Sequence, residues 1–359
     1  MDALYRRKLW NNSLRSRNRI QIVQKVLFGV GVFVTLLLLG GFALPSHSRF
    51  IVTADIDAPR ATVFALVNDM RRKDLWSPVT ATDPNARIIF SGPVRGVGST
   101  ITWDGSIAGS GTQSITVSRP FEFVETLINA GEAGESRTWF ELAEGMGFTR
   151  VSWGFEHDYG LNVVGRYFGL MMTGIIRRDY DLDIDGLRDL AESLPRTDFA
   201  DIRIEQLTVE PADIAYVRTT SAPAAGATSE AMGAALFEVL NFIDEHGLSE
   251  AGAPISIARA FSGAELRFDS AIPIRGLTAA TPRDDSGVRI GRTYGGTVIR
   301  VQHTGSYRKL SETHRKIAAY LAAVGLERNG DSWESYVSDP TKTDEAALLT
   351  YIHYPIGVL

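Results

Sequence analysis

The feature that most constrains this chain is an uncharged apolar run at residues 26–44, VLFGVGVFVTLLLLGGFAL. Its 19 residues come close to the ~20 that a helix needs to cross a hydrocarbon core about 30 Å thick. A buried core helix is the alternative, but such helices rarely lack a polar face. The sequence therefore predicts one transmembrane helix at residues 26–44.

Basic residues before this run set its predicted orientation. Residues 1–25 hold seven bases and one acid, whereas Arg49 is the only base soon after the run. The positive-inside rule then places residues 1–25 in the cytoplasm as a basic segment and everything after about residue 46 on the other side. Signal-peptide cleavage after Ala43 is an alternative, but so long a basic leader is unusual for a signal peptide. We expect an uncleaved, single-pass anchor in the cell (inner) membrane, with a periplasmic or extracellular body.

The composition of the remaining chain excludes several classes of protein. With 359 residues, of which 44% are hydrophobic and 22% charged, the chain is globular and long enough for two or three domains. Without the basic segment, the 37 bases and 42 acids become 30 and 41, so the body has a net charge of −11. Such a body repels phosphate backbones, and we expect no nucleic-acid partner. The absence of cysteine excludes disulfides and thiolate metal sites.

Hydrophobic patterning organises residues 48–194 as a strand, a short helix, about six strands and a long helix. Apolar residues alternate over residues 50–56, which is typical of a half-buried strand, and Asp57 is then a helix N-cap. Short apolar runs separated by glycine, proline or charged turns fill residues 87–155 and predict an antiparallel meander. A helical pattern at residues 161–194 completes the predicted domain.

Four runs are the most specific part of this region. They are IDAPRATVFALVNDM at 56–70, LWSP at 75–78, GVGSTITW at 96–103 and GFTRVSW at 147–153. With these runs the region resembles the START-like or polyketide cyclase/dehydrase (SRPBCC) superfamily, which has a helix-grip fold. The resemblance implies a curved sheet around the last helix and a cavity for an apolar or amphipathic ligand. At one position where the family often has a second aromatic residue, this chain has Lys73.

Aromatic residues that could line such a cavity are frequent in the same region. Our candidates for ligand contact are Trp76, Trp103, Trp153 and Tyr167. Ordinary core packing is the alternative for each tryptophan. The superfamily has no universal catalytic residue, so the resemblance implies binding without implying a reaction.

Residues 195–201 form a polar, proline-led linker, and an internal repeat follows it. Each repeat unit is predicted as strand, helix, strand and strand, with helices at 229–246 and 306–324 and a glycine stop after each. Both units end with Pro-Ile, 82 residues apart. The repeat predicts a duplicated β-α-β-β domain at residues 202–359, with pseudo-twofold symmetry and a ligand groove between its halves.

Two short runs give this repeat a family resemblance: GSYRKL at 305–310 and, above all, WESYVSDP at 333–340. They resemble the gyrase-inhibitor-like (GyrI-like, AraC-type) effector-binding domain. The resemblance implies that Glu334 lies at the floor of an aromatic pocket and faces a cationic or amphipathic ligand. The other candidate contacts in this pocket are Tyr336, Tyr307 and Trp333.

An organic cation suits such a pocket for two physical reasons. A buried carboxylate without a partner is costly, and aromatic faces attract cations by about 0.5–2 kcal/mol. The alternative for Glu334 is a solvated strand residue, or an ion pair with Arg300 or Arg308. The regulators that share this domain carry a helix-turn-helix segment, and this sequence has none, so direct transcriptional control is not expected.

Catalytic and metal-binding patterns are sparse. The sequence has no G-x-S-x-G, H-E-x-x-H or phosphate-binding glycine loop, and its six histidines lack metal-ligand spacing. An S-x-x-K pattern joins Ser306 to Lys309, but a helix N-cap explains the serine. Some stand-alone gyrase-inhibitor-like proteins hydrolyse small electrophilic compounds with the pocket glutamate and a tyrosine. That resemblance keeps an enzyme hypothesis open, although we assign no catalytic residue, metal or cofactor.

The preferred hypothesis is an α+β, membrane-tethered protein that binds small molecules. An apolar or lipid-like ligand would occupy the START-like cavity, and an amphipathic or cationic ligand the C-terminal groove. One rival is a pocket hydrolase in which Glu334 is the general base and Tyr336 or Tyr307 assists. Another is a protein-interaction module. The sequence leaves open the ligands, the protein partners, communication between the domains and the oligomeric state.

Overall fold

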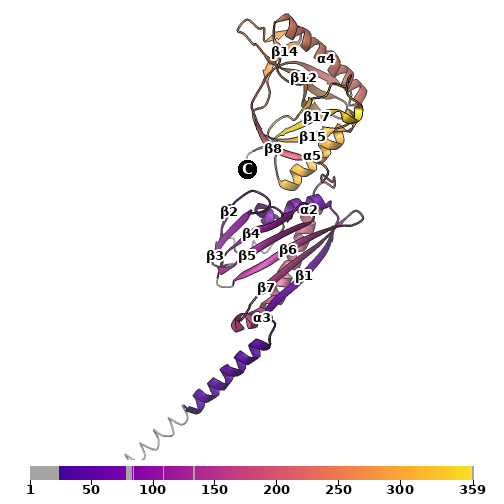
Figure 1. Ribbon diagram of the computed structural model, residues 1–359. Helices are drawn as coiled ribbons and strands as arrows, with labels where there is room; N and C mark the ends of the chain where they lie inside the picture. Colours follow the sequence, from indigo (N-terminus) through magenta and orange to yellow (C-terminus); the bar gives the residue numbers. More distant parts are fainter. Residues whose placement is uncertain (1–23, 78–82, 84, 108, 132–133, 358–359) are drawn as a thin grey trace, which may run out of the picture. The chain divides into compact units, whose positions relative to one another are not determined.

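The computed structural model describes residues 24–77, 83, 85–107, 109–131 and 134–357 (Figure 1). The predicted basic segment lies almost wholly outside this part of the chain. The described residues form two compact units, one within Met1–Asp55, Val67–Ala143 and Arg150–Asp189, the other within Ile56–Leu66, Glu144–Thr149 and Leu190–Leu359. We call them the seven-stranded unit and the ten-stranded unit, after the sheet that each contains.

An N-terminal helix, Gln24–Ala43, precedes the first strand. It covers nearly all of the predicted span and is long and apolar enough to cross a membrane. Residues 24–40 are all exposed. A core helix of a globular domain would be mostly buried, and this helix is not.

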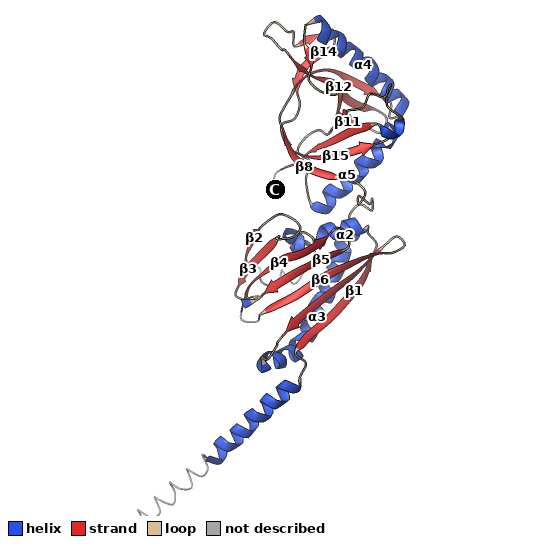
Figure 2. Ribbon diagram, viewed as in Figure 1, coloured by secondary structure: helices blue, strands red, loops and turns tan. Residues whose placement is uncertain are grey.

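The seven-stranded unit is built on an antiparallel sheet with the strand order β1-β7-β6-β5-β4-β3-β2. The elements of residues 47–193 are β1 (His47–Ile56), α2 (Arg60–Val67), η1 (Met70–Leu75), β2 (Arg87–Ser91), β3 (Thr100–Gly105), β4 (Gly109–Arg119), β5 (Phe123–Asn129), β6 (Glu135–Glu144), β7 (Thr149–Asp158) and α3 (Val163–Ser193). Helix α2 falls almost wholly in the ten-stranded unit. Six strands between a short and a long helix agree with the predicted order. Figure 2 shows α3 lying along one face of the sheet.

An aromatic stack made of Trp76, Phe140, Trp153 and Tyr180 joins this sheet to α3. The Trp153 ring lies 4.0 Å from the Tyr180 ring and 4.6 Å from the Phe140 ring, each within 28° of parallel. Trp76 meets Trp153 edge-on at 5.8 Å. All four side chains are buried. Thr138 accepts a hydrogen bond from the Trp153 indole at 2.7 Å, so this buried N–H is satisfied.

The ten-stranded unit contains the second antiparallel sheet, in the order β13-β14-β9-β12-β11-β16-β17-β15-β8, with β10 paired to β12. Its elements are β8 (Ile204–Val209), β9 (Asp213–Ser221), α4 (Ala225–Glu245), β10 (Ser249–Glu250), β11 (Ile255–Phe261), β12 (Leu266–Arg275), β13 (Asp284–Asp285), β14 (Val288–Arg292), β15 (Gly296–Thr304), η4 (Tyr307–Lys309), α5 (Leu310–Val324), β16 (Trp333–Tyr336), η5 (Glu345–Ala347) and β17 (Leu349–Pro355). The protein is therefore a mixed α+β chain with two antiparallel sheets.

Strand order in this second sheet is compatible with the predicted duplication. Strands β9, β12 and β11 occupy one half, β15, β17 and β16 the other, and the halves meet where β11 pairs with β16. The sequence pattern does not predict β8 and β14. Strand β8 precedes β9 in the chain but pairs with β15, whereas β14 precedes β15 but pairs with β9. Each half of the sheet thus receives a strand from the other half of the sequence.

Both long helices of this unit end at a glycine with positive φ, as predicted. Gly247 (φ 62°) follows α4 and Gly325 (φ 68°) follows α5, a conformation that glycine adopts without strain. The predicted start of α4 at Ser229 is wrong, because the helix begins at Ala225. The alanine-rich residues 224–227 favour one further helical turn.

Two apolar cores lie on opposite faces of the ten-stranded sheet. On one face, Val239, Phe242 and Ile243 of α4 pack near Ala215 and Ile272 of the sheet. The core of the other face consists of Ile214, Ile255, Ile257, Ala271, Val298 and Trp333. Successive strand residues point to opposite faces. Trp333 of β16 belongs to the second core, so the next residue, Glu334, faces the side of the sheet that α4 covers.

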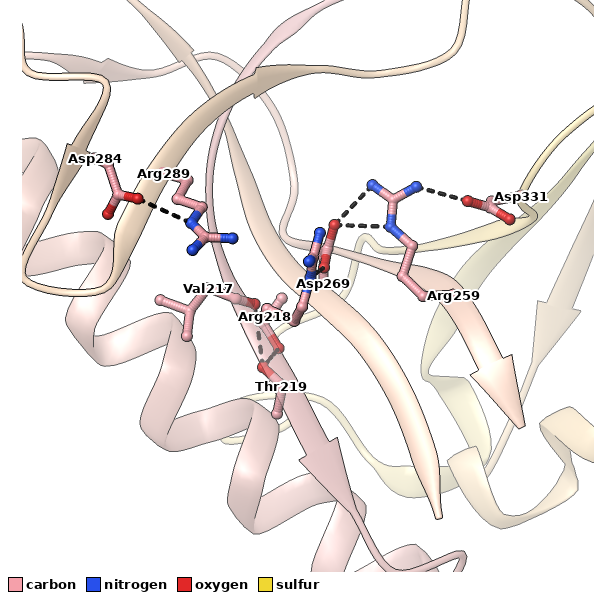
Figure 3. A network of polar contacts seen from close by, with 9 residues as sticks. Val217, Arg218, Thr219, Arg259, Asp269, Asp284, Arg289 and Asp331 are labelled. Atoms are coloured by element: carbon pink, nitrogen blue, oxygen red, sulfur yellow. Dashed lines mark hydrogen bonds and ion pairs between the residues drawn. The ribbon is translucent and has the colours of Figure 1, made fainter. Parts of the chain in front are cut away.

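A buried ionic network crosses three strands of the same sheet (Figure 3). Asp269 on β12 is fully buried and accepts hydrogen bonds from the Arg259 guanidinium at 2.7 and 2.8 Å. Arg218 approaches the same carboxylate at 3.5 Å, and Arg259 also pairs with Asp331 at 2.6 Å. The network ties β9, β11 and β12 together.

Candidate functional site

A cavity of about 830 Å³ opens in the ten-stranded unit. This volume falls within the ~300–1,000 Å³ typical of small-molecule sites. One wall comes from α4, with Met232 and Leu236, and another from the residues around η4 and β16. The charged and aromatic lining residues are Glu250, Tyr307, Arg308, Glu334, Tyr336 and Asp339.

Glu334 lies on β16, where the two halves of the sheet meet. Its partner in the strand register is Ser256 on β11. One carboxylate oxygen accepts a hydrogen bond from Nε2 of His314 at 2.7 Å, and the other accepts one from the Tyr336 hydroxyl. The side chain is 18% exposed and lines the cavity. Glu334 is therefore a part-buried carboxylate with two protein partners, not a solvated strand residue.

His314 is a site residue that the sequence analysis does not find. It lies on α5, and its Nδ1 is 2.7 Å from the hydroxyl of Tyr354 on β17. Tyr336, Glu334, His314 and Tyr354 thus form one hydrogen-bonded chain. Helical spacing places His314 on the same face as the buried residues Leu310, Ile317 and Leu321. That spacing was the available signal that His314 points inward.

Tyr307 and Tyr336 provide the aromatic part of the site. Their rings are 5.3 Å apart and nearly perpendicular. Burial, followed by the charge of Glu334, raises the pKa of the Tyr336 hydroxyl well above its usual value. Burial also raises the pKa of Tyr307, with smaller contributions from Asp339 and Glu334. Both phenols therefore stay neutral at physiological pH and present rings and hydroxyl groups to the cavity.

Negative charge predominates in the cavity lining. Glu250, Glu334 and Asp339 are set against one base, Arg308, among these residues. Hydrogen bonds from Thr341 and an ion pair with Lys342 hold the pKa of the Asp339 carboxyl well below its usual range. The lining thus has a clear excess of carboxylates.

Arg300 and Arg308 are the two alternative ion-pair partners of Glu334. Arg300 pairs with Glu205 at 2.6 Å and lies over the Tyr351 ring at 4.8 Å. Arg308 lines the cavity, but the close partner of the Glu334 carboxylate is His314. Among the described residues, Glu334 therefore forms no ion pair with an arginine.

Trp333 lies on the opposite face of β16 from Glu334. It belongs to the apolar core of that face, and its ring stacks on His353 at 4.6 Å with an angle of 6°. Burial lowers the pKa of His353 to about 4, so the stacked imidazole is neutral. Among the predicted contacts, the structure brings Glu334, Tyr336 and Tyr307 together at the cavity and places Trp333 in the core.

The four candidates in the seven-stranded unit do not converge on one point. Trp76 and Trp153 belong to the aromatic stack, whereas Trp103 is half-buried on β3 beside Gly111. Tyr167 lies near the start of α3, where its hydroxyl donates to the Leu37 carbonyl at 2.9 Å.

Lys73 adds a polar group to the interior of this unit. Its ammonium donates to the Gln113 side chain at 2.7 Å, and Gln113 donates in turn to Thr126 at 2.7 Å. Burial lowers the pKa of Lys73, and the charge of Asp183 offsets part of this effect. The buried indole N–H of Trp76 has no hydrogen-bond partner among the described residues.

Metal binding finds no support in the part of the chain that the structure describes. No group of three or more His, Asp or Glu side chains there could hold a metal ion.

A family match supports the assignment of the second unit. Residues 202–356 match the model of the GyrI-like small molecule binding domain. Domains of this family bind small molecules, so the match implies small-molecule binding by this part of the chain. No curated protein matches the sequence.

Three solved structures illustrate the more distant likenesses. The C-terminal domain of EcmrR is 12% identical, with 44% of this chain and 99% of that chain covered and a TM-score of 0.37. A hydrolase from Listeria innocua is 15% identical, with 43% and 92% covered and a TM-score of 0.33. The Aha1 dimer from Colwellia psychrerythraea is 16% identical, with 40% and 96% covered and a TM-score of 0.30.

Proposed function

We propose that this chain, with its GyrI-like domain at residues 202–356, is a membrane-tethered binding protein for amphipathic organic cations. The observation that carries the proposal is Glu334, a part-buried carboxylate that lines a cavity together with Tyr307 and Tyr336. A ligand with a positive charge and an apolar body would match both features.

The physical chemistry of the site favours a cation over a neutral ligand of the same shape. Hydrogen bonds from His314 and Tyr336 hold the Glu334 carboxylate in place, so little ordering is needed when a ligand arrives. The tyrosine rings add a cation–π attraction of about 0.5–2 kcal/mol. The surrounding excess of carboxylates raises the local concentration of cations.

Binding of a fluorescent hydrophobic cation, such as rhodamine 6G, to the full-length protein in lipid nanodiscs tests the proposal. We expect E334Q to weaken binding at least tenfold, about 1.4 kcal/mol, because an amide cannot balance the charge of the ligand. Y336F is the matched control, since it removes the hydroxyl that contacts Glu334 but keeps the ring. Equal affinity of the wild type and E334Q would contradict the proposal.

For residues 48–194 we propose a START-like (SRPBCC) domain with an apolar or lipid-like ligand. The four sequence runs and the position of α3 along the sheet support this assignment. Trp76, Trp103, Trp153 and Tyr167 remain the candidate contacts. Native mass spectra of the full chain with a panel of lipids should show a bound lipid, and spectra without any adduct would argue against it.

We also propose that residues 26–44 form an uncleaved anchor, with the N-terminus in the cytoplasm and the domains at 48–194 and 202–359, joined by 195–201, outside it. The exposed apolar helix Gln24–Ala43 and the preceding bases support this topology. Protease added to spheroplasts should digest the two domains and spare the N-terminal segment. Protection of the domains would reverse the orientation.

A second candidate function is hydrolysis of small electrophilic compounds. The observation that favours it is the chain of Tyr336, Glu334 and His314, because a carboxylate between an imidazole and a phenol can move a proton during the attack of water. Turnover of a reactive ester or a strained-ring compound, lost in both E334Q and H314A, would establish it. Retention of the compound without conversion would exclude it for that compound.

A further inference from the structure

An apolar stripe runs along the first half of α3. It consists of Val164, Phe168, Met171 and Ile175, which are 77%, 55%, 75% and 53% exposed. Leu161, just before the helix, is 83% exposed. The spacing of three or four residues places these side chains on one face of the helix. We call these five residues the α3 stripe.

The α3 stripe does not belong to the core of its own unit. Buried residues of the helix, among them Gly169, Tyr180, Ile184 and Leu187, lie on the roughly opposite side. Large apolar side chains that are exposed together at helical spacing indicate a surface that another apolar phase covers.

The second half of the same helix has a different outer face. After Ile175 the exposed positions include Arg177, Arg178, Asp181 and Asp185, with Leu182 as an apolar exception. A helix that simply faced water would not need two such different halves. The change from apolar to charged therefore marks a boundary along α3.

Three hydrogen bonds place the start of α3 beside the end of the N-terminal helix. The Arg166 guanidinium donates to the carbonyls of Phe42 and Leu44 at 3.1 and 3.2 Å. The Tyr167 hydroxyl donates to the Leu37 carbonyl at 2.9 Å. If residues 26–44 cross a membrane, the α3 stripe therefore begins where the chain leaves it.

Charge in this segment also suits a lipid surface. Residues 159–178 contain no acid but three bases, Arg166, Arg177 and Arg178. Anionic headgroups attract arginines close to the bilayer. An apolar stripe with flanking bases is the pattern of a helix that lies in the membrane interface.

We propose that the α3 stripe is immersed in the interface of the membrane that the N-terminal helix crosses. The helical part of the stripe, from Val164 to Ile175, spans about 16 Å at ~1.5 Å per residue. The seven-stranded unit is thus held against the lipid surface by α3 as well as by its anchor. This inference rests on the membrane tether of the proposed function, but not on the cation site.

Depth-dependent fluorescence quenching tests the inference directly. Because the chain has no cysteine, a single introduced cysteine in the full-length protein carries one NBD label without further changes. F168C and M171C report on the stripe, and D181C and D185C are controls on the outer face of the same helix. In vesicles with headgroup-proximal doxyl lipids, we expect the stripe labels to be quenched at least threefold more than the controls.

The remaining outcomes distinguish the alternatives. Equal quenching of stripe and control labels would overturn the inference while leaving the anchor intact. Preferential quenching that depends on a high protein-to-lipid ratio would assign the stripe to a contact between copies of the chain and would also overturn it. Extraction of the protein from the vesicles by alkaline carbonate would show that the N-terminal helix is not a membrane anchor. Cation binding measured on the same preparations reports separately on Glu334.

Discussion

The two units of this protein use their aromatic residues in different ways. In the seven-stranded unit, Trp76, Phe140, Trp153 and Tyr180 pack against one another and join the sheet to α3. In the ten-stranded unit, Tyr307 and Tyr336 meet at an open cavity of about 830 Å³. The aromatic residues of the first unit are thus packed against one another, those of the second border a cavity, and the polar residues beside them differ as well.

The charged residues beside these aromatic side chains also have different surroundings in the two units. Lys73 extends an ammonium into the seven-stranded unit and is partnered there by Gln113. Glu334 is held by His314 and Tyr336 and still lines a cavity. A charge enclosed within a domain mainly costs stability, whereas a held charge at a cavity wall can recognise a ligand.

The largest expected effect concerns the aromatic stack. W153A should destabilise the seven-stranded unit by about 3–5 kcal/mol, because it removes a buried ring and leaves a void between Phe140 and Tyr180. Y307A, at the cavity, should cost only about 1 kcal/mol in the ten-stranded unit because this ring is part-exposed. Hydrogen exchange of the full chain, resolved by peptide, measures both. Similar losses of unfolding free energy in W153A and Y307A would contradict this difference between the two units.

The next effect concerns the ionic network of the ten-stranded unit. D269N should destabilise this unit by about 3 kcal/mol, since it leaves the Arg259 guanidinium without its buried counter-ion. D284N is the matched control: Asp284 pairs with Arg289 at 3.1 Å but is 61% exposed, so its loss should cost less than about 0.5 kcal/mol. Unfolding by urea, monitored by hydrogen exchange of the same peptides, compares D269N with D284N. If D269N costs no more than D284N, burial of the Asp269 network does not add to the stability of this unit.

The smallest expected effect is a pH dependence from Lys73. Burial lowers the pKa of this lysine below the 10.5 of an exposed one. Between the lowered pKa and about 10.5, the unfolded chain binds more protons than the folded chain, so this contribution to stability rises with pH.

The variant K73M should remove that rise. Lys342 provides a control of opposite sign, because Asp339 raises its pKa and its contribution is lost as pH increases through the raised value. Unfolding free energies of wild type, K73M and K342M between about pH 8 and 11 decide the matter. A pH profile of K73M that parallels the wild type would show that Lys73 does not differ from a surface lysine.

Much of the fold could be predicted from local patterns. Alternation over residues 50–56 predicted β1, and the glycines at 247 and 325 predicted the ends of α4 and α5. Strands β8 and β14 could not be predicted in the same way, because each pairs with the half of the sheet that its neighbour in sequence does not occupy. Such pairing depends on tertiary register, which a short apolar run does not encode.

The candidate site shows the same limit. Glu334 and Tyr336 are two residues apart on one strand, so they share a face, and the same rule places Trp333 on the other. His314 is 20 residues from Glu334 on a different element, and no fixed sequence spacing joins a helix residue to the strand residue that it meets. Likewise, Trp76, Trp103 and Trp153 lie on separate elements, and their sequence positions did not reveal whether they converge.

The central claim is that Glu334 recognises the positive charge of a ligand. The most direct test measures the affinities of two ligands of the same shape, one a quaternary ammonium and the other its neutral carbon analogue, for wild type and E334Q in nanodiscs. The account predicts that the wild type prefers the cation at least tenfold, about 1.4 kcal/mol, and that E334Q loses this preference while its affinity for the neutral ligand changes little. An equal preference for the cation in both proteins would contradict it.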